Sequence, residues 1–284
     1  MTRRLAGFFY GRPHLQVGAL LAGPVSWLVV GYLGSLAILL VAAFWSVDPL
    51  SGEVVHSLSL ENFKTLVDEP VYRDIVGRTV LIAALVTLTD AVLAFPIAFY
   101  MAKVASRRGK AILVVAVLLP LWSSYLVKVY SWRTMLSADG VINWALSPLG
   151  LHGPGFGNTA VWLVMSYLWL PYMILPIYAG LERIPNSLIS ASEDLGAAPF
   201  TTFRRVLLPL AFPAVVAGSI FTFALTLGDY ITPRLVSNSQ FIGNVIFNNI
   251  TNNQPLASAL ALVPIVVMIA YLLVARKLGA FEHI

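Results

Sequence analysis

The chain has 284 residues, of which 58% are hydrophobic and 11% are charged, and its formal net charge is +5. Soluble domains carry about a quarter charged residues, so this composition predicts a protein that faces lipid over most of its surface. The sequence contains no cysteine, which excludes disulfides, thiolate metal sites and cysteine nucleophiles. The four scattered histidines show no paired metal spacing, and membrane topology explains the positive charge better than nucleic acid does.

Six stretches are long and apolar enough to cross a bilayer core of roughly 30 Å, which takes about 20 residues of helix. They run from Leu20 to Trp45, Ile75 to Ala102, Ala111 to Met135, Thr159 to Leu181, Pro209 to Leu227 and Leu256 to Ala275, and a polar extension continues the fifth to Arg234. The first stretch is too long for a signal sequence, so we interpret it as a retained anchor. The predicted fold is an all-α integral membrane protein with six transmembrane helices in a single domain, residues 1–284.

Basic residues gather on one side of these spans. Twelve of the 18 lysines and arginines fall on the side of the N-terminus: Arg3, Arg4, Arg12, Lys103, Arg107, Arg108, Lys110, Arg183, Arg204, Arg205, Arg276 and Lys277. The positive-inside rule then predicts that both termini are cytoplasmic, with residues 1–19 as a cytoplasmic N-terminal segment. The turn at Arg107 and Arg108 could also touch anionic lipid, although orientation alone explains it.

Aromatic side chains gather near the predicted outer ends of two spans, with Trp122 and Tyr125 on the third, and Trp169 and Tyr172 on the fourth. Such residues commonly form an aromatic belt at the level of the lipid headgroups. They can also line a solute vestibule, where a cation contacts the face of a ring. The sequence alone leaves both interpretations open.

Two acidic residues lie within or at the edge of predicted spans, Asp90 in the second and Asp229 near the outer end of the fifth. A charge at the bilayer centre costs about 2.5 kcal/mol or more, so such residues usually mark a solute path or a charged partner. The simpler alternatives are that Asp229 pairs with Arg234 and that Asp90 bonds to threonines or to a neighbouring subunit. The predicted solute path comprises Asp229, Tyr230, Asp90, Trp122 and Tyr125.

The cytoplasmic loop between the fourth and fifth spans predicts two short helices with a break between them. Pro185 can open the first helix, and Leu188, Ala191 and Leu195 share one of its faces at helical spacing. Gly196 stands where a helix would end in a left-handed cap.

The second helix of this loop is predicted to begin at Pro199, and Pro209 punctuates the approach to the fifth span. Its apolar side is formed by Phe203, Val206 and Leu207. An amphipathic helix exposed in the cytoplasm must bury its stripe on its own subunit, on lipid, or in the groove of a partner.

The run from Ser192 to Ala197 reads Ser-Glu-Asp-Leu-Gly-Ala, and the segment ends in Leu207-Leu208-Pro209. This pattern resembles the cytoplasmic signature loop of ABC-importer permeases, in which Glu-Ala-Ala and a glycine precede an apolar-x-Leu-Pro ending. The opening Glu-Ala-Ala is replaced by Ser-Ala-Ser here, with two acids beside it. The resemblance implies an ATPase-docking loop over residues 183–208, with contacts from Ser190, Ala191, Glu193, Asp194, Leu195, Gly196, Ala197, Phe203 and Pro209.

The same resemblance implies the partners. A member of this family works with two ATP-binding cassette subunits, a second, homologous permease subunit (in a homo- or heterodimer) and an external solute-binding protein, within membrane lipid and without nucleic acid. The sequence contains no Gly-x-x-x-x-Gly-Lys-Ser/Thr motif, so the chain is predicted to be a transport subunit and not an enzyme. No cofactor is expected on this chain, because ATP and Mg would be used by the partner ATPase. The predicted location is the bacterial plasma (inner) membrane.

The transported solute is suggested by the segment Leu227 to Pro233. It resembles the acidic, aromatic and proline-containing stretch that ends the fifth span in spermidine/putrescine-type permeases. This resemblance favours a polyamine, although related permeases carry ferric ion, thiamine, phosphonates or opines. A proton-coupled secondary carrier is the main rival of another class, and would need coupling ionisable residues and usually an internal repeat. A structural or assembly membrane protein is a further alternative.

Overall fold

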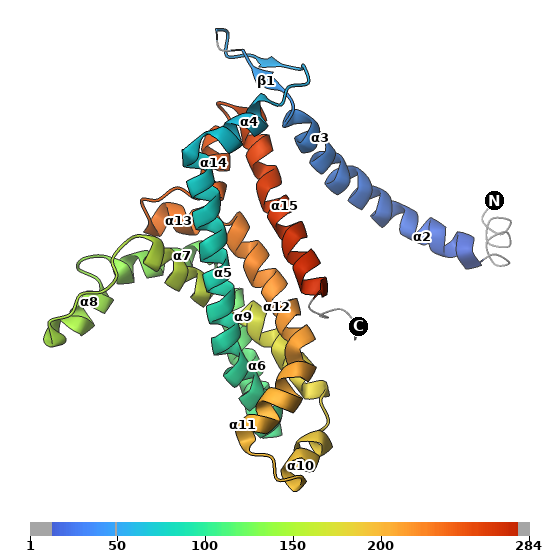
Figure 1. Cartoon of the computed structure of the whole chain (residues 1–284), viewed down its shortest axis with the longest axis vertical. Coiled ribbons are helices and arrows are strands. Elements are labelled where there is room, and N and C mark those ends of the chain that lie inside the picture. Colours follow the sequence, from blue (N-terminus) through green and yellow to red (C-terminus); the bar gives the residue numbers. More distant parts are fainter. Residues whose placement is uncertain (1–12, 49, 278–284) are drawn as a thin grey trace. The chain divides into compact units, whose positions relative to one another are not determined.

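The computed structural model describes residues 13–48 and 50–277 (Figure 1). The chain divides into two compact units, one of Met1–Thr65 with Asn249–Ala259, the other of Leu66–Asn248 with Leu260–Ile284. Each unit is described by itself below, and the second unit holds the residues on which the functional argument rests.

The first unit contains the N-terminal apolar helix and a small hairpin. The helix consists of α2 (Pro13–Trp27), the π-helix η1 (Leu28–Leu33) and α3 (Gly34–Ala42). Strands β1 (Ser46–Val47) and β2 (Val54–Val55) pair antiparallel, and α4 (Glu61–Asp68) follows. The side-chain amide of Asn62 donates hydrogen bonds to the carbonyls of Ala43 and Trp45, at 3.0 Å and 2.7 Å, and so joins α4 to the end of α3.

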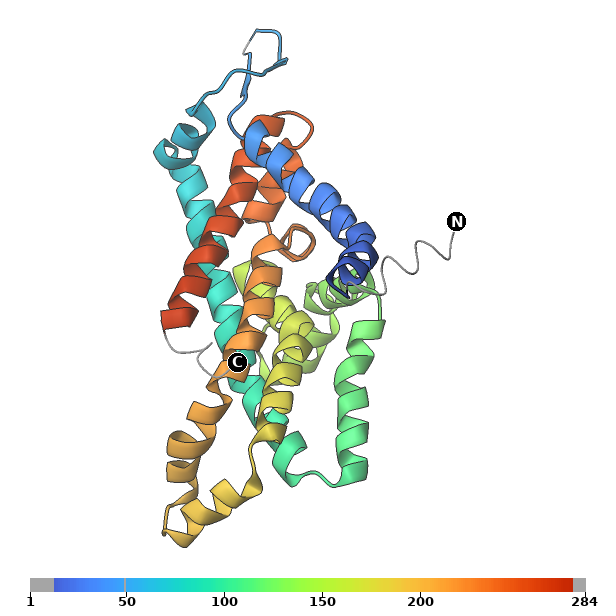
Figure 2. The same ribbon diagram turned by 90° about the vertical axis from the view of Figure 1, so that its right-hand side faces the viewer.

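The second unit is built around three long helices that pack together, α5 (Pro70–Phe99), α9 (Asn158–Arg183) and α12 (Leu208–Gly228) (Figures 1 and 2). The contacts between these helices are formed by small and apolar residues, such as the buried Val86, Ala94 and Ala98 on one face of α5. The remaining elements of this unit are η2 (Tyr100–Val104), α6 (Arg107–Trp122), α7 (Tyr125–Leu136), α8 (Val141–Leu146), η3 (Ser147–Leu149), α10 (Asn186–Asp194), α11 (Pro199–Thr202), η4 (Phe203–Leu207), α13 (Ile231–Val236) and α14 (Ile242–Asn249). Helix α15 (Gln254–Lys277) begins in the first unit and continues in the second.

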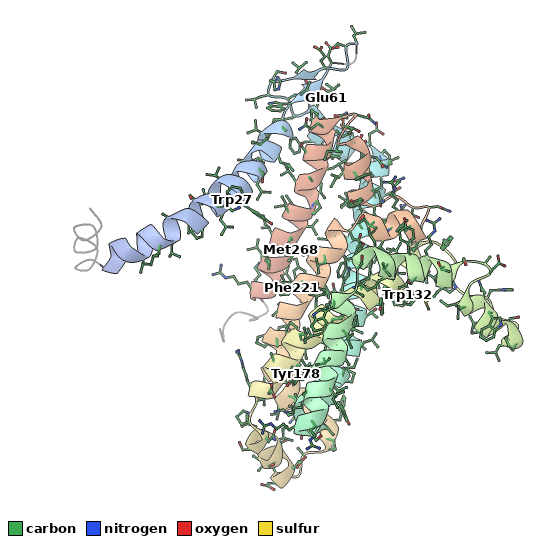
Figure 3. The ribbon with its side chains drawn as sticks, turned by 180° about the vertical axis from the view of Figure 1, so that it is seen from behind. Trp27, Glu61, Trp132, Tyr178, Phe221 and Met268 are labelled. Carbon is green, nitrogen blue, oxygen red and sulfur yellow. The ribbon has the colours of Figure 1, made fainter. Side chains whose placement is uncertain are left out.

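Four of the six predicted membrane spans, the first, second, fourth and sixth, coincide with long helices of the structure. By length and composition, five helical runs can cross a membrane: Leu20–Ala42, Pro70–Val104, Asn158–Arg183, Pro199–Gly228 and Gln254–Lys277. A sixth span exists if Arg107–Trp122 and Tyr125–Leu149 are counted together. Large apolar side chains are exposed along these helices, Phe221 among them (Figure 3), as expected where lipid is the solvent.

Two predicted spans differ from the structure. The third was expected to be continuous from Ala111 to Met135, but α6 and α7 meet at an angle of 88° after Trp122. The fifth was expected to begin at Pro209, but its helix runs unbroken from Pro199 to Gly228. Pro209 stands near the N-terminal end of α12, directly after the wider turn of η4, which accommodates a residue that cannot donate a backbone hydrogen bond.

The three π-helical segments share a position relative to proline. η1, η2 and η4 each begin four residues after a proline, namely Pro24, Pro96 and Pro199. Proline lacks the N–H that an α-helix needs at its position, and its ring crowds the preceding turn. Pro24 and Pro96 lie inside their helices, and a local widening follows each without ending the helical run, whereas Pro199 opens its helix.

Candidate functional site

Asp229 occupies the junction between α12 and α13. Helix α12 ends at Gly228, and the extended backbone of Asp229 turns the chain before α13 begins at Ile231. The Asp229 Oδ1 atom accepts hydrogen bonds from the backbone N–H groups of Ile231 and Thr232, at 2.9 Å and 3.1 Å. The carboxylate thus satisfies amides of the first turn of α13 that have no partner within the helix.

A tyrosine from a distant part of the chain meets the same carboxylate. Tyr125, the first residue of α7, places its hydroxyl 2.7 Å and 2.6 Å from the two carboxylate oxygens of Asp229, and 2.8 Å from Thr232 Oγ1. Thr232 Oγ1 also donates to Asp229 Oδ2 at 2.6 Å. Hydrogen bonds to an ionised oxygen are short and strong, so this network fixes α7 against α13.

An open pocket of about 360 Å³ lies beside this network. Its walls are formed by Tyr125, Trp169, Ala224, Leu225, Gly228, Asp229, Tyr230 and Ile231. Trp169 of α9 lies parallel to Tyr125, with ring centroids 6.0 Å apart and an interplanar angle of 13°. The pocket therefore combines one carboxylate with three aromatic rings, a set of groups that suits an organic cation.

Tyr230 and Arg234 are held by a second aromatic stack. The Tyr230 ring lies parallel to Phe247 of α14 at 4.9 Å, and the Arg234 guanidinium lies 5.0 Å from the centre of the Phe247 ring. In the part of the chain that the structure describes, the side-chain ion pair within 4.0 Å is that of Lys110 with Glu182. Asp229 therefore does not form an ion pair with Arg234, and its carboxylate lines the pocket.

The other predicted path residues lie away from this pocket. Trp122 ends α6 and is 82% exposed, on the far side of the break from Tyr125. Asp90 is fully buried on α5 between Val86 and Ala94, and neither of its oxygens has a hydrogen-bond partner among the described residues. The structure thus brings together Tyr125, Asp229 and Tyr230, and leaves Trp122 and Asp90 outside the set.

One aromatic residue of the pocket and one residue of the adjoining hydrogen-bond network were not predicted as part of the path. Trp169 was predicted to lie in an aromatic belt or a solute vestibule but was not named in the path, and its Nε1 atom is buried with no hydrogen-bond partner among the described residues. Thr232 was not singled out, although it follows Asp229 at the three-residue spacing of a helix cap. Trp132 of α7, by contrast, packs on Tyr167, with ring centroids 5.5 Å apart (Figure 3).

The predicted loop between the fourth and fifth spans has the expected local structure. Pro185 precedes α10, Pro199 opens α11, and Gly196 has a φ of +77°. The Gly196 N–H donates to Glu193 O at 2.8 Å and the Ala197 N–H to Ser192 O at 3.0 Å. These two bonds are those of a glycine-terminated helix end, so the predicted left-handed cap is confirmed.

The loop lies at one end of the second unit (Figure 1), and several of its apolar side chains are exposed. Leu195 is 88% exposed and Phe200 is 70% exposed. The polar and small residues predicted at the docking surface, Ser190, Ala191, Glu193 and Asp194, are exposed as well. Phe203 differs, because it turns inward and packs edge to face on Phe95 of α5 at 5.3 Å.

Comparisons with known proteins agree with this architecture. The family described as "Binding-protein-dependent transport system inner membrane component" matches residues 2–280. The chain is 44% identical to the inner membrane ABC transporter permease protein YdcU of Escherichia coli K12, over 98% of this chain and 95% of that one. It is 29% identical to the spermidine/putrescine transport system permease protein PotB of Haemophilus influenzae, over 84% and 85% of the two chains.

Solved structures of low sequence identity show the same fold. A bacterial ABC transporter involved in the import of the acidic polysaccharide alginate aligns with a TM-score of 0.72 at 20% identity, over 97% of this chain and 98% of that one. The MetNI methionine ABC transporter in an inward-facing conformation aligns with a TM-score of 0.56 at 17% identity, over 73% and 94%. The chain belongs to the family of binding-protein-dependent transport system inner membrane components, as a multi-pass permease subunit of an ABC importer.

Proposed function

We propose that this permease carries a polyamine, and that the pocket at Asp229 binds one of the ammonium groups of the solute during its passage. The observation that carries this proposal is that Tyr125, Trp169 and Tyr230 surround a single carboxylate, in a pocket whose described lining residues include no lysine or arginine. The relatives named as spermidine/putrescine permeases support it, whereas the name of the 44% identical relative specifies no solute.

The chemistry of the pocket favours a cation with a slender, partly apolar body. Asp229 already accepts bonds from two hydroxyl groups and two amides, so its remaining contribution to a ligand is its negative charge. The hydroxyl of Tyr125 donates to this carboxylate, which raises the electron density of the ring that faces the pocket. A cation over such a ring is attracted to its face, while the alkyl chain of a polyamine would contact the neighbouring rings. An anionic solute such as a phosphonate would be repelled at the same place.

The exposed stripe on α10 and α11 is proposed to be the site where a separate ATPase binds. An apolar helix face that stays uncovered in its own subunit suits a groove of a partner protein. Residues 183–208 would then be cytoplasmic, as would both termini, and the external binding protein would meet the opposite face. Two ATP-binding cassette subunits, carrying ATP and Mg, and a second permease subunit would complete the transporter around residues 1–284 as a single permease domain.

The experiment that tests this function is solute-stimulated ATP hydrolysis. The chain would be reconstituted in lipid with the products of its neighbouring genes, and spermidine, putrescine, thiamine and ferric ion would be compared. Stimulation by a polyamine supports the proposal. Stimulation by one of the other solutes would retain the importer and reject the polyamine.

The docking surface is tested in the same preparation. Leu195→Asp places a charge in the middle of the exposed stripe, and Leu58→Asp makes the same change at an exposed leucine of the other unit. We expect the ATPase to co-purify with the Leu58 variant and to be lost from the Leu195 variant, with both chains still inserted in the membrane. Retention of the ATPase and of transport by the Leu195 variant would reject the docking surface.

A further inference from the structure

A lysine at the end of the second span reaches the entrance of the docking loop. Lys103 lies on η2, and its Nζ donates hydrogen bonds to Ile184 O at 2.5 Å and to Asn186 Oδ1 at 3.1 Å. Ile184 is the residue after the end of α9, and Asn186 is the first residue of α10. A single ammonium group therefore connects one span to the junction between another span and the loop.

A second lysine makes a matching connection from α6. The Nζ atom of Lys110 donates to Ala102 O of η2 at 2.9 Å, and lies 3.3 Å from Glu182 Oε1 in the last turn of α9. Together, the two lysines join η2, α6, α9 and the start of α10 at the end of the second unit where the docking loop lies (Figure 2).

Each lysine donates to a backbone carbonyl at or near the C-terminal end of a helix. The last carbonyl groups of a helix have no partner within it, and a nearby cation interacts favourably with the negative end of the helix dipole. Hydrogen bonds from an ammonium group are also stronger than those between neutral groups. The Lys110 and Glu182 side chains are 29% and 48% exposed, so their ion pair adds little to folding stability. The lysines therefore fix geometry more than they stabilise the fold.

The connection spans a weak point of the chain. Ile184 and Pro185, between α9 and α10, are extended, with ψ angles of 120° and 137°. The backbone of these two residues lies outside both helices, so the link between them can bend when α10 is displaced. Lys103 bridges this link on both sides, because it holds the carbonyl of Ile184 and the side chain of Asn186 at once.

Neighbouring arginines provide a contrast. Arg107 and Arg108 open α6, between the two lysines in sequence, and are exposed; the described part of the structure shows no hydrogen bond or ion pair from their side chains. Membrane topology explains all four basic residues equally well at the level of sequence. The contacts distinguish the lysines from the arginines.

We propose that Lys103 and Lys110 are positioning residues that couple the docking loop to the spans. A displacement of α10 by the ATPase is passed through Lys103 to η2 and α5, and through Glu182 and Lys110 to α6, instead of being absorbed at the extended link. The proposal rests on the docking loop proposed above. It adds two residues outside that loop that transmit the movement and do not bind the ATPase.

The test compares Lys103→Met and Lys110→Met with Arg108→Met as the matched control, in the full transporter reconstituted in lipid vesicles. Methionine keeps the length and helix propensity of the side chain and removes its charge. We expect the ATPase to co-purify with all three variants, and solute uptake per ATP hydrolysed to fall about fivefold or more in the two lysine variants only. Lys103→Arg, which retains a donor, should recover part of the loss.

A second measurement reports on the link itself. Amide hydrogen exchange of the isolated permease in detergent should become faster at residues 184–188 in Lys103→Met and remain unchanged in Arg108→Met. Wild-type uptake per ATP in both lysine variants would overturn the proposal, as would loss of the ATPase from them, since the lysines would then only fold the loop. A wild-type chain that binds no ATPase would instead reject the docking loop itself.

Discussion

Asp229 and Asp90 are two carboxyl groups at the level of the spans, and their surroundings are opposite. Asp229 accepts hydrogen bonds from Tyr125, from the Thr232 hydroxyl and from two backbone amides, beside an open pocket. Asp90 lies in the closely packed face of α5, where neither oxygen has a partner among the described residues. The sequence marks both as unusual, because an acid in an apolar helix is rare wherever it stands.

The two carboxyl groups differ in whether hydrogen-bond donors surround them. Hydrogen-bond donors meet both oxygens of Asp229, beside an open pocket that a cationic solute can enter. An ionised Asp90 would carry the full cost of desolvation. On this comparison, Asp229 is the better candidate for solute contact, and the assignment of Asp90 to the path stays a prediction that requires its own test.

The largest expected effect is that of Asp229→Asn. The substitution removes the charge and replaces one carboxylate oxygen with an N–H₂ donor. In the wild-type chain, the hydroxyl groups of Tyr125 and Thr232 donate to these oxygens, so a donor would then face a donor. Such unmatched buried groups cost about 1–3 kcal/mol. We expect polyamine uptake to fall about 100-fold, which corresponds to roughly 2.7 kcal/mol. The control is Asp139→Asn, the same change at an exposed acid of the α7–α8 turn. Uptake within about twofold of wild type in the Asp229 variant would contradict the site.

A smaller effect is expected from Tyr125→Phe. The ring stays parallel to Trp169, while the hydroxyl that contacts Asp229 and Thr232 is lost. A hydrogen bond to a charged group contributes about 1.5–3 kcal/mol, part of which the Thr232 hydroxyl can replace. The half-saturating polyamine concentration should rise about tenfold, measured against Tyr130→Phe, an exposed residue of the same helix. An unchanged half-saturating concentration would mean that the Tyr125 hydroxyl does not contribute to solute binding at Asp229.

The smallest effect is expected from Asp90→Asn. No hydrogen bond of the described structure is lost, and a neutral amide is easier to bury than an ionised carboxylate. The stability of the chain in detergent should change by less than about 1 kcal/mol, and uptake should stay within about twofold. A tenfold loss of uptake at unchanged stability would end the contrast between the two acids and assign Asp90 to the solute path.

Much of the fold follows from local patterns in the sequence. Hydropathy locates the spans because lipid requires about 20 apolar residues in each, and it needs no knowledge of tertiary contacts. The glycine cap at Gly196 and the helix starts after Pro185 and at Pro199 depend on backbone chemistry within a few residues. These predictions are therefore confirmed at nearly the expected positions.

The pocket could be predicted only in part. Asp229 and Tyr230 are neighbours, but Tyr125 meets Asp229 across 104 residues of sequence, and nothing local to either residue specifies that contact. For Trp169, the sequence alone cannot decide between a belt and a vestibule, because the choice depends on the contact of α9 with α7. The turn between α6 and α7 was missed for a related reason. Hydropathy averages over Ser123 and Ser124, two small polar residues within an apolar run, and hides the break.

That break has a consequence for what one chain can accomplish alone. Helix α6 has 16 residues, or about 24 Å at 1.5 Å per residue, which is less than a bilayer core of roughly 30 Å. Ser123 and Lys128 donate side-chain hydrogen bonds to Pro120 O, but the backbone of the break is exposed. Non-helical backbone at membrane depth must meet either water or another protein. If α6 and α7 together form the third crossing, the break between them therefore needs water or a neighbouring protein beside it.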